Sequence, residues 1–155
     1  MPKFLVHFMG DLHQPLHCGK AEDRGGNDVP VSWQNQETNL HAIWDSLIFR
    51  ERTGTVTTWA RCLQAELTPG ERAAIMKGRP YDWMVESHLI ARDFCYARLP
   101  RSASSFREAK NPELSGAYAR EAQPIGRRRV VEAGLRLAKV LNEIFSSGPA
   151  GAQVK

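Results

Sequence analysis

The sequence predicts an all-α fold with one short strand or hairpin. Apolar residues recur at helical spacing through most of the chain, whereas alternation typical of a strand is confined to residues 29–33. Proline, glycine and capping residues divide the chain into helix-sized segments. With 155 residues, 42% of them hydrophobic and 25% charged, the chain is long enough for one domain with a packed core.

The predicted helices follow one another along almost the whole chain. They are expected over residues 3–14, from 38 or 39 to 48, 57–67, 68–77, 80–99 and 125–145, with another helix opening at residues 111–112. Residues 18–37 between the first two helices are the most loop-like part, because glycine, aspartate and asparagine are frequent there.

Proline and capping residues set most of these boundaries. Pro15 ends the first helix, and Pro100 ends the helix that opens at residue 80. The segment Thr68–Glu71 forms a capping box with proline at the first helical position. In the last helix, apolar residues step by four and three between residues 130 and 144, which is the clearest helical period in the chain.

The domain is expected to span residues 1–146, followed by a disordered Gly/Pro/Ser-rich tail over residues 147–155. No apolar run approaches the roughly 18 residues needed to cross a membrane, so no membrane contact is expected. The apolar start of the chain also lacks the cleavage site of a signal peptide. The residues themselves therefore indicate no compartment.

Charge is divided unevenly along the chain. The first 50 residues contain four Lys/Arg and six Asp/Glu, whereas the whole chain has 21 and 17, so the remainder is basic. An acidic, histidine-containing front beside a basic remainder suits a cation site next to an anionic ligand, although solvated helix faces explain the basic part equally well. For the arginines at residues 127–129 we expect a solvated helix start, with phosphate contact as the alternative.

Cysteine usage argues against a cysteine-rich zinc site. The three cysteines, Cys18, Cys62 and Cys95, are widely spaced and form no C-x-x-C pair. They fit either free thiols or one disulfide with a spare thiol.

Histidine and aspartate form a repeated pattern near the start of the chain. His7 and Asp11 are one turn apart on a single helix face, and His41 and Asp45 repeat this spacing on the next helix. His17 lies between the two pairs. One such pair alone is typical of a surface ion pair, but two pairs with a histidine between them favour a metal site. Mixed nitrogen and oxygen ligands suit zinc, ahead of manganese or iron, in a hydrolytic site.

Several sequence blocks around these residues resemble those of a known family. The blocks are HFMGDLHQPLH at 7–17, DRGGN at 23–27, NLHAIWD at 39–45, WMVES at 83–87, and AGLRLA with LN at 133–142. In order, spacing and residue type they are similar to the signature blocks of the zinc-dependent S1/P1 nucleases, over roughly residues 3–146. The resemblance implies a multi-helix domain of the zinc nuclease and phospholipase C type.

The resemblance also implies an activity and a set of ligands. Such enzymes use three zinc ions to cleave single-stranded DNA and RNA to 5′-phosphorylated products, and they remove 3′-phosphates from nucleotides. His7 and Asp11 match ligands of an exposed metal pair, with Asp11 as the bridging carboxylate. His17, His41 and Asp45 match the ligands of a deeper single metal. A carboxylate bridging two zinc ions would lower the pKa of a shared water and help to polarise the phosphate.

Family members begin well upstream of the first block, and further ligands come from that upstream half. We therefore expect this chain to be the C-terminal half, with the deep site complete, about one tightly bound zinc, and an incomplete exposed pair. A full-length member is expected to be secreted or periplasmic and monomeric, with single-stranded nucleic acid or nucleotides as substrate. The fragment should expose apolar helix surface and tend to self-associate.

Two further groups of residues are weaker candidates. Gly25, Gly26 and Asn27 are candidates to place backbone N–H groups and an amide near a bound nucleotide, with a plain turn as the alternative. Glu86 is a candidate acceptor for the free N–H of a ligand histidine, with a surface salt bridge as the alternative.

Two other functional readings stay open. One is a non-catalytic, zinc-stabilised helical module, and the other is a hydrolase similar to zinc phospholipase C. The blocks at residues 23–27 and 39–41 favour the nuclease over the phospholipase.

Overall fold

The fold is helical apart from a single hairpin. A computed structural model describes residues 2–50, 52–100 and 111–146. The predicted all-α class with one short hairpin is confirmed. The elements in chain order are α1 (Pro2–Asp11), the 3-10 helix η1 (Pro15–Cys18), β1 (Pro30–Trp33), β2 (Gln36–Asn39), α2 (Leu40–Asp45), the 3-10 helix η2 (Leu47–Phe49), α3 (Val56–Ala65), α4 (Pro69–Ile75), α5 (Pro80–Ile90), the π-helix η3 (Ala91–Tyr96) and α6 (Ala117–Ser146).

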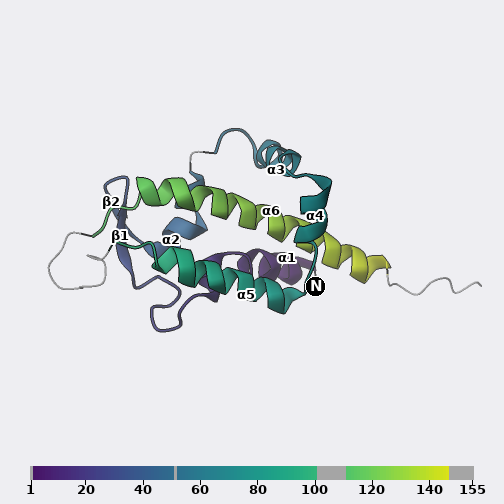
Figure 1. The fold of residues 1–155 in the computed structure, drawn as a ribbon, viewed down its shortest axis with the longest axis horizontal. Coiled ribbons are helices and arrows are strands. Elements are labelled where there is room, and N and C mark those ends of the chain that lie inside the picture. Colours follow the sequence, from purple (N-terminus) through teal and green to yellow (C-terminus); the bar gives the residue numbers. More distant parts are fainter. Residues whose placement is uncertain (1, 51, 101–110, 147–155) are drawn as a thin grey trace, which may run out of the picture.

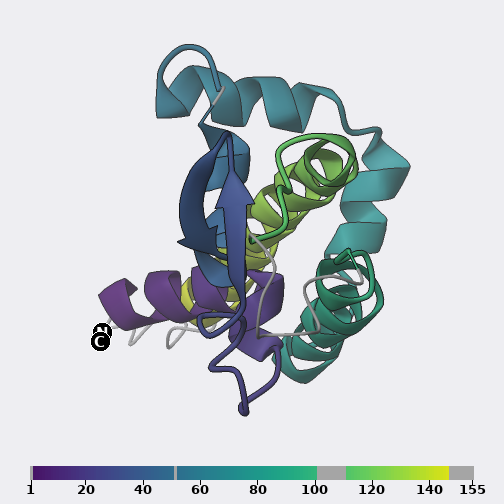
Figure 2. The same cartoon turned by 90° about the vertical axis from the view of Figure 1, so that its left-hand side faces the viewer.

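Helix α6 is the longest element and runs along much of the molecule (Figure 1). The other helices and the hairpin lie around it (Figure 2). Elements α1, α3, α4 and η2 contact α6, whereas α5 makes its main contacts with η1 and η3. No described helix is both long and apolar enough to span a membrane.

Local sequence signals explain the starts of several helices. Thr68 and Glu71 form the expected capping box at the start of α4. The Asn39 side chain accepts a hydrogen bond from the backbone N–H of Ala42 at 2.8 Å and so caps α2. The hairpin ends directly at this cap, because β1 and β2 pair antiparallel with Pro30 opposite Asn39. The hairpin therefore fixes the start of α2.

The expected helix at residues 111–112 is wrong. The backbone there pairs with β1: the Ser32 N–H donates to the Pro112 carbonyl at 2.8 Å, and the Leu114 N–H donates to the Ser32 carbonyl at 2.9 Å. Helix α6 begins only at Ala117 and then continues through Pro124 without a break. The backbone groups of Pro112 and Leu114 therefore find their hydrogen-bond partners on the edge of β1 and not within a helix.

Three helices end three or more residues earlier than expected. Helix α1 stops at Asp11, since the N–H groups of His13 and Gln14 bond three residues back as the chain approaches Pro15. Helix α2 stops at Asp45 and is followed by the separate 3-10 helix η2. The helix expected over residues 80–99 changes to the π-helix η3 at Ala91. The tail over residues 147–155 lies outside the described residues.

The main core lies between the hairpin, α2, η3 and the first turns of α6. Its buried residues are Leu16, Val29, Val31, Trp33, Leu40, Ile43, Trp44, Ile48, Ala91, Cys95, Leu114, Tyr118, Ala119 and Ala122. The Trp44 indole N–H crosses this core and donates to the Tyr118 hydroxyl at 2.9 Å. Helix α2 is thus anchored by both its apolar face and a buried hydrogen bond.

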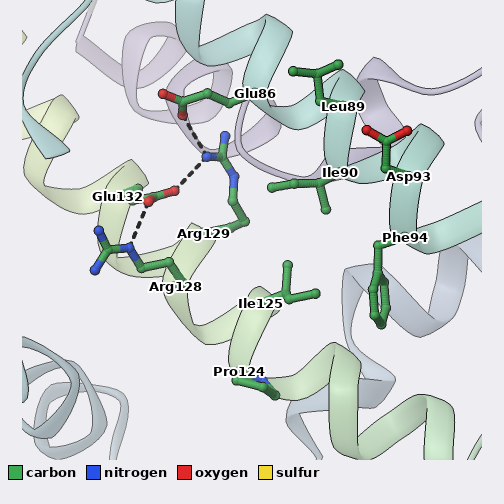
Figure 3. Close-up of a pocket in the computed structure, with 10 residues that line it drawn as sticks. All are labelled: Glu86, Leu89, Ile90, Asp93, Phe94, Pro124, Ile125, Arg128, Arg129 and Glu132. Carbon is green, nitrogen blue, oxygen red and sulfur yellow. Dashed lines mark hydrogen bonds and ion pairs between the residues drawn. The ribbon is translucent and has the colours of Figure 1, made fainter.

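A layer of buried charge joins α5 to α6. Arg129 is 4% exposed, and its Nη1 donates to Glu86 at 2.9 Å and to Glu132 at 2.6 Å (Figure 3). Arg136 is 3% exposed and donates to both carboxylate oxygens of Glu86, at 2.6 and 2.9 Å. Because these charges are desolvated, each depends on its partner to remain buried.

His13 connects this charged layer to α1. Its Nδ1 contacts the Met9 carbonyl at 2.7 Å, and its Nε2 contacts Arg136 Nη1 at 3.1 Å. Since a carbonyl can only accept and a guanidinium can only donate, the proton must be on Nδ1. Burial lowers the pKa of His13 to about 4, so the ring is neutral near pH 7.

Candidate metal centre

Helix α1 presents the first histidine and aspartate of the candidate site on one face. His7 Nε2 lies 3.1 Å from Asp11 Oδ2, one turn away. The His7 side chain is 67% exposed and that of Asp11 is 37% exposed. This pair is therefore the more accessible end of the site.

The 3-10 helix η1 folds His17 back against two carboxylates. Its Nδ1 lies 3.5 Å from Asp11 Oδ1 and its Nε2 lies 3.3 Å from Asp45 Oδ1. Pro15 begins this turn, and the side chain of Gln14 caps it by accepting a hydrogen bond from the Leu16 N–H at 2.5 Å. Pro15 and Leu16 are buried, so the turn is fixed by packing as well as by its cap.

Helix α2 supplies the other two side chains. Its apolar residues Leu40, Ile43 and Trp44 are buried in the core, which leaves His41 and Asp45 on the outward face one turn apart. His41 Nε2 lies 3.3 Å from Asp45 Oδ2. The His41 and His17 rings stack with centroids 5.1 Å apart and planes 17° apart.

Three of these side chains converge as a group. One donor atom from each of His17, His41 and Asp45 lies within 4.8 Å of the other two. Catalytic zinc sites have three protein ligands and keep a fourth position for water. The two imidazoles and one carboxylate here match that number of protein ligands. All five expected residues are linked by successive contacts. Asp11 contacts both His7 and His17, and Asp45 contacts both His17 and His41.

The hydrogen bonding of His41 fits a metal ligand. Its Nδ1 donates to the Gly25 carbonyl at 2.8 Å, which leaves Nε2 to face an oxygen of Asp45 at 3.3 Å. Ligand histidines in metal sites commonly donate their other N–H in this way.

The loop before the hairpin positions His41 through its backbone. Asp23 accepts hydrogen bonds from the Gly26 N–H and from the Tyr96 hydroxyl, both at 2.8 Å. The Gly26 carbonyl accepts from the His41 N–H at 3.2 Å. The loop thus holds both the backbone and the ring of His41.

The candidates Gly25, Gly26 and Asn27 lie in the loop that holds His41. Gly25 N–H donates to the Lys20 carbonyl at 2.7 Å, and Gly26 N–H donates to Asp23. The Asn27 amide donates to the Arg24 carbonyl at 2.9 Å. The two glycine N–H groups are thus used within the loop, and the Gly25 and Gly26 carbonyls contact the ring and the backbone N–H of His41. Contact of this loop with a nucleotide stays a prediction.

Replacing Gly25 by alanine is expected to weaken both folding and metal binding. Gly25 has a φ of +64°, and an added Cβ would lie 2.4 Å from the Leu16 carbonyl oxygen. We expect a loss of about 2 kcal/mol or more in urea unfolding. We also expect a roughly 10- to 100-fold loss in zinc affinity, because the clash would displace the residue-25 carbonyl that orients His41.

Gly70→Ala is the matched control, since nothing lies within 4 Å of its added Cβ. It should leave stability unchanged or slightly raised. Equal stability and zinc affinity in the two variants would contradict the role given to Gly25.

Gln14 belongs to the site although the sequence did not single it out. Its Nε2 donates to Asp45 Oδ1 at 2.8 Å, and its Oε1 caps η1. Gln14 therefore links the Asp45 carboxylate at the end of α2 to η1, the turn that carries His17. The only sequence signal was its position within the block at residues 7–17.

Glu86 does not contact a ligand histidine. Glu86 bonds instead to Arg129 and Arg136 of the buried layer. Partial burial raises the pKa of Glu86, but hydrogen bonds and charge from these two guanidinium groups lower it overall. The expectation that Glu86 supports a metal ligand is therefore replaced by a role in joining α5 to α6. A carboxylate beside two buried guanidiniums is already satisfied.

Fold and site together define a helical protein with a His₂Asp cluster at its surface and a second His–Asp pair beside it. A sequence model of the S1/P1 nuclease family matches residues 1–146, and the chain belongs to that family. It is 34% identical to Endonuclease 4 of Arabidopsis thaliana over 96% of this chain and 52% of that protein. It is 31% identical to Nuclease S1 of Aspergillus oryzae over 93% of this chain and 54% of that protein. The chain thus spans about half the length of the curated relatives it matches.

Proposed function

We propose that this chain contributes the zinc-binding part of a phosphodiester hydrolase that cleaves single-stranded DNA and RNA to 5′-phosphorylated products and removes 3′-phosphates from nucleotides. The observation that carries the proposal is the convergence of His17, His41 and Asp45 in a chain of this family. The second His–Asp pair adjoins that cluster through Asp11. A site for neighbouring metal ions is the arrangement that phosphate hydrolysis uses.

In this proposal His17, His41 and Asp45 hold one zinc ion. Asp11 and His7 contribute two of the ligands of a neighbouring pair, with Asp11 placed to bridge. Bound zinc would supply an activated water and charge stabilisation for the phosphate. The chain's own residues orient the ligands: Gln14 holds Asp45, and the Gly25 carbonyl holds His41.

The family favours the nuclease over the two alternatives. The relatives compared above are named as nucleases or endonucleases, which argues against a phospholipase C-like substrate. The other alternative is a non-catalytic helical module that zinc stabilises. It would be favoured if the second metal pair, at His7 and Asp11, stays incomplete.

We also propose that α1 promotes self-association of this chain, because Phe4 and Phe8 are 71% and 61% exposed and stack on one another.

The activity is tested by joining this chain to the part of a relative that it does not match. We expect the 155-residue chain alone to cleave single-stranded DNA slowly or not at all, because only the three-ligand site is complete. Joined to the part of the Aspergillus oryzae nuclease that it does not match, it should cleave when zinc is present. Asp45→Asn should then lower the rate at least about 100-fold, the loss that follows removal of one group stabilising the transition state.

The control is Asp93→Asn, an exposed aspartate that pairs with Arg92 on η3 and should leave cleavage unchanged. Cleavage that persists without zinc, or in Asp45→Asn, would contradict the proposed metal centre. Robust cleavage by the chain alone would show that the pair at His7 and Asp11 needs no further ligands.

A further inference from the structure

A small cavity lies beside the candidate metal centre, where η2, α3 and α6 meet. It has a volume of about 170 Å³ and is lined by Ile48, Phe49, Arg52, Trp59, Gln123 and Arg127. Figure 2 shows α3 lying next to α6, and these two helices are in contact. We call this cavity the Arg52–Arg127 cavity.

The Arg52–Arg127 cavity is built for an anion next to an apolar surface. Arg52 and Arg127 are exposed, and neither guanidinium group has an ion pair or hydrogen bond among the described residues. Phe49 and Trp59 form an edge-to-face aromatic pair with centroids 5.7 Å apart. Unpaired guanidinium groups bind phosphate through two parallel hydrogen bonds.

The cavity shares one wall residue, Phe49, with a second cavity that reaches Asp45 of the candidate metal centre. A second cavity of about 260 Å³ is lined by Gln14, Asp45 and Phe49 together with residues of α1 and α6. Phe49 therefore forms part of both cavity walls. The close approach of α6 to η2 at this point depends on Gly126, where a Cβ would lie 2.6 Å from Ile48 and 3.0 Å from Phe49.

Beyond Arg127 the lining is mixed in charge. A third cavity shares Arg127 and is also lined by Arg128, Glu66 and Glu71. Arg128 already pairs with Glu132 at 2.8 Å. Among the arginines that line these two cavities, those without an ion pair to a described residue are therefore Arg52 and Arg127.

We infer that the Arg52–Arg127 cavity binds a backbone phosphate of a single-stranded nucleic acid that is cleaved at the metal centre. This rests on the proposed function and adds a second point of contact for the same substrate. The cavity is smaller than sites for whole drug-sized ligands, which suits one phosphate group better than a complete nucleotide. Basic grooves with aromatic side chains are how proteins follow single strands without reading their sequence.

The test measures binding of a fluorescein-labelled octathymidylate to the zinc-loaded chain by anisotropy over a series of salt concentrations. Arg52→Gln and Arg127→Gln should each weaken binding about 3- to 10-fold. Each should also reduce the slope of log affinity against log salt by about 0.7, the value for one lost phosphate contact on a single strand. The zinc content of both variants should equal that of the parent chain.

Arg61→Gln is the matched control, because Arg61 is exposed on α3 with Trp59 but does not line the cavity. Equal weakening in Arg61→Gln would mean general charge attraction and would overturn the inference, as would unchanged binding in Arg52→Gln and Arg127→Gln. Octathymidylate that does not bind the parent chain would also overturn it. A chain that binds through Arg127 but holds no zinc would instead contradict the proposed function.

Discussion

Replacing His41 by alanine is expected to remove tight zinc binding from this chain. The parent chain should bind about one equivalent tightly, because His17, His41 and Asp45 are the group whose donor atoms converge. Loss of a partner that only orients a ligand typically costs 10- to 100-fold in metal affinity, so loss of a ligand itself should cost roughly 100-fold or more. Zinc titration with a competing chelator measures the change directly.

Two histidine variants separate ligation from general effects. His88→Ala removes an exposed imidazole that contacts the Cys18 carbonyl and lies outside the cluster, and it should keep the tight equivalent. His7→Ala should also keep it, because His7 contacts Asp11 and not the three converging residues. A parent chain without zinc by mass spectrometry, or tight binding that survives in His41→Ala, would show that the ligand assignment is wrong.

Chelation of that zinc is expected to reduce the helical signal in circular dichroism. The metal would join η1 to α2, because its proposed ligands come from both elements. Metal binding and folding are coupled in such sites. An unchanged spectrum after removal of bound zinc would mean that the fold holds the site open without metal.

The sequence predicted most of the helices because their signals are local. The capping box at Thr68 and the Asn39 cap each depend on residues within one turn, and both form as expected. The start of α6 depends instead on a distant partner, since residues 112–114 pair with Ser32 of β1. No local rule could show that this strand edge was available.

In the candidate site too, the part that depends on local spacing was predictable, and the part that depends on distant segments was not. The spacing of His7 with Asp11 and of His41 with Asp45 was readable from helix geometry, and the structure places each pair one turn apart. The contributions of Gln14 and of the Gly25 carbonyl arise from a turn and a loop folding against α2. A backbone carbonyl has no side-chain signature, so the sequence alone could not assign the Gly25 carbonyl to His41.

The arginines at residues 127–129 show the same limit on α6. A run of three charges is typical of a solvated helix start, and Arg127 is indeed exposed. Arg129 however shares a helix face with Glu132 and Arg136, at steps of three and four, and that face is buried. These three residues have the spacing of one helix face, but all of them are charged. The apolar period that normally identifies a buried face is therefore missing there.

Replacing Arg129 by methionine is therefore expected to cost much more stability than the same change at its neighbour Arg128. Arg129 is 4% exposed and donates to Glu86, Glu132, Ser87 and two backbone carbonyls. Its loss leaves Glu132, which is 9% exposed, with a single partner. Breaking a buried ion pair in this way typically costs about 3–5 kcal/mol.

Arg128→Met provides the matched comparison, because the Arg128 side chain is 40% exposed and also pairs with Glu132 at 2.8 Å. A pair of that exposure contributes at most about 1 kcal/mol. Urea unfolding of both variants, each with and without zinc, gives the two free energies of unfolding. If the two variants lose equal stability, the buried layer does not hold α5 to α6; if Arg129→Met loses stability only when zinc is present, the layer acts through the metal centre and not through helix packing.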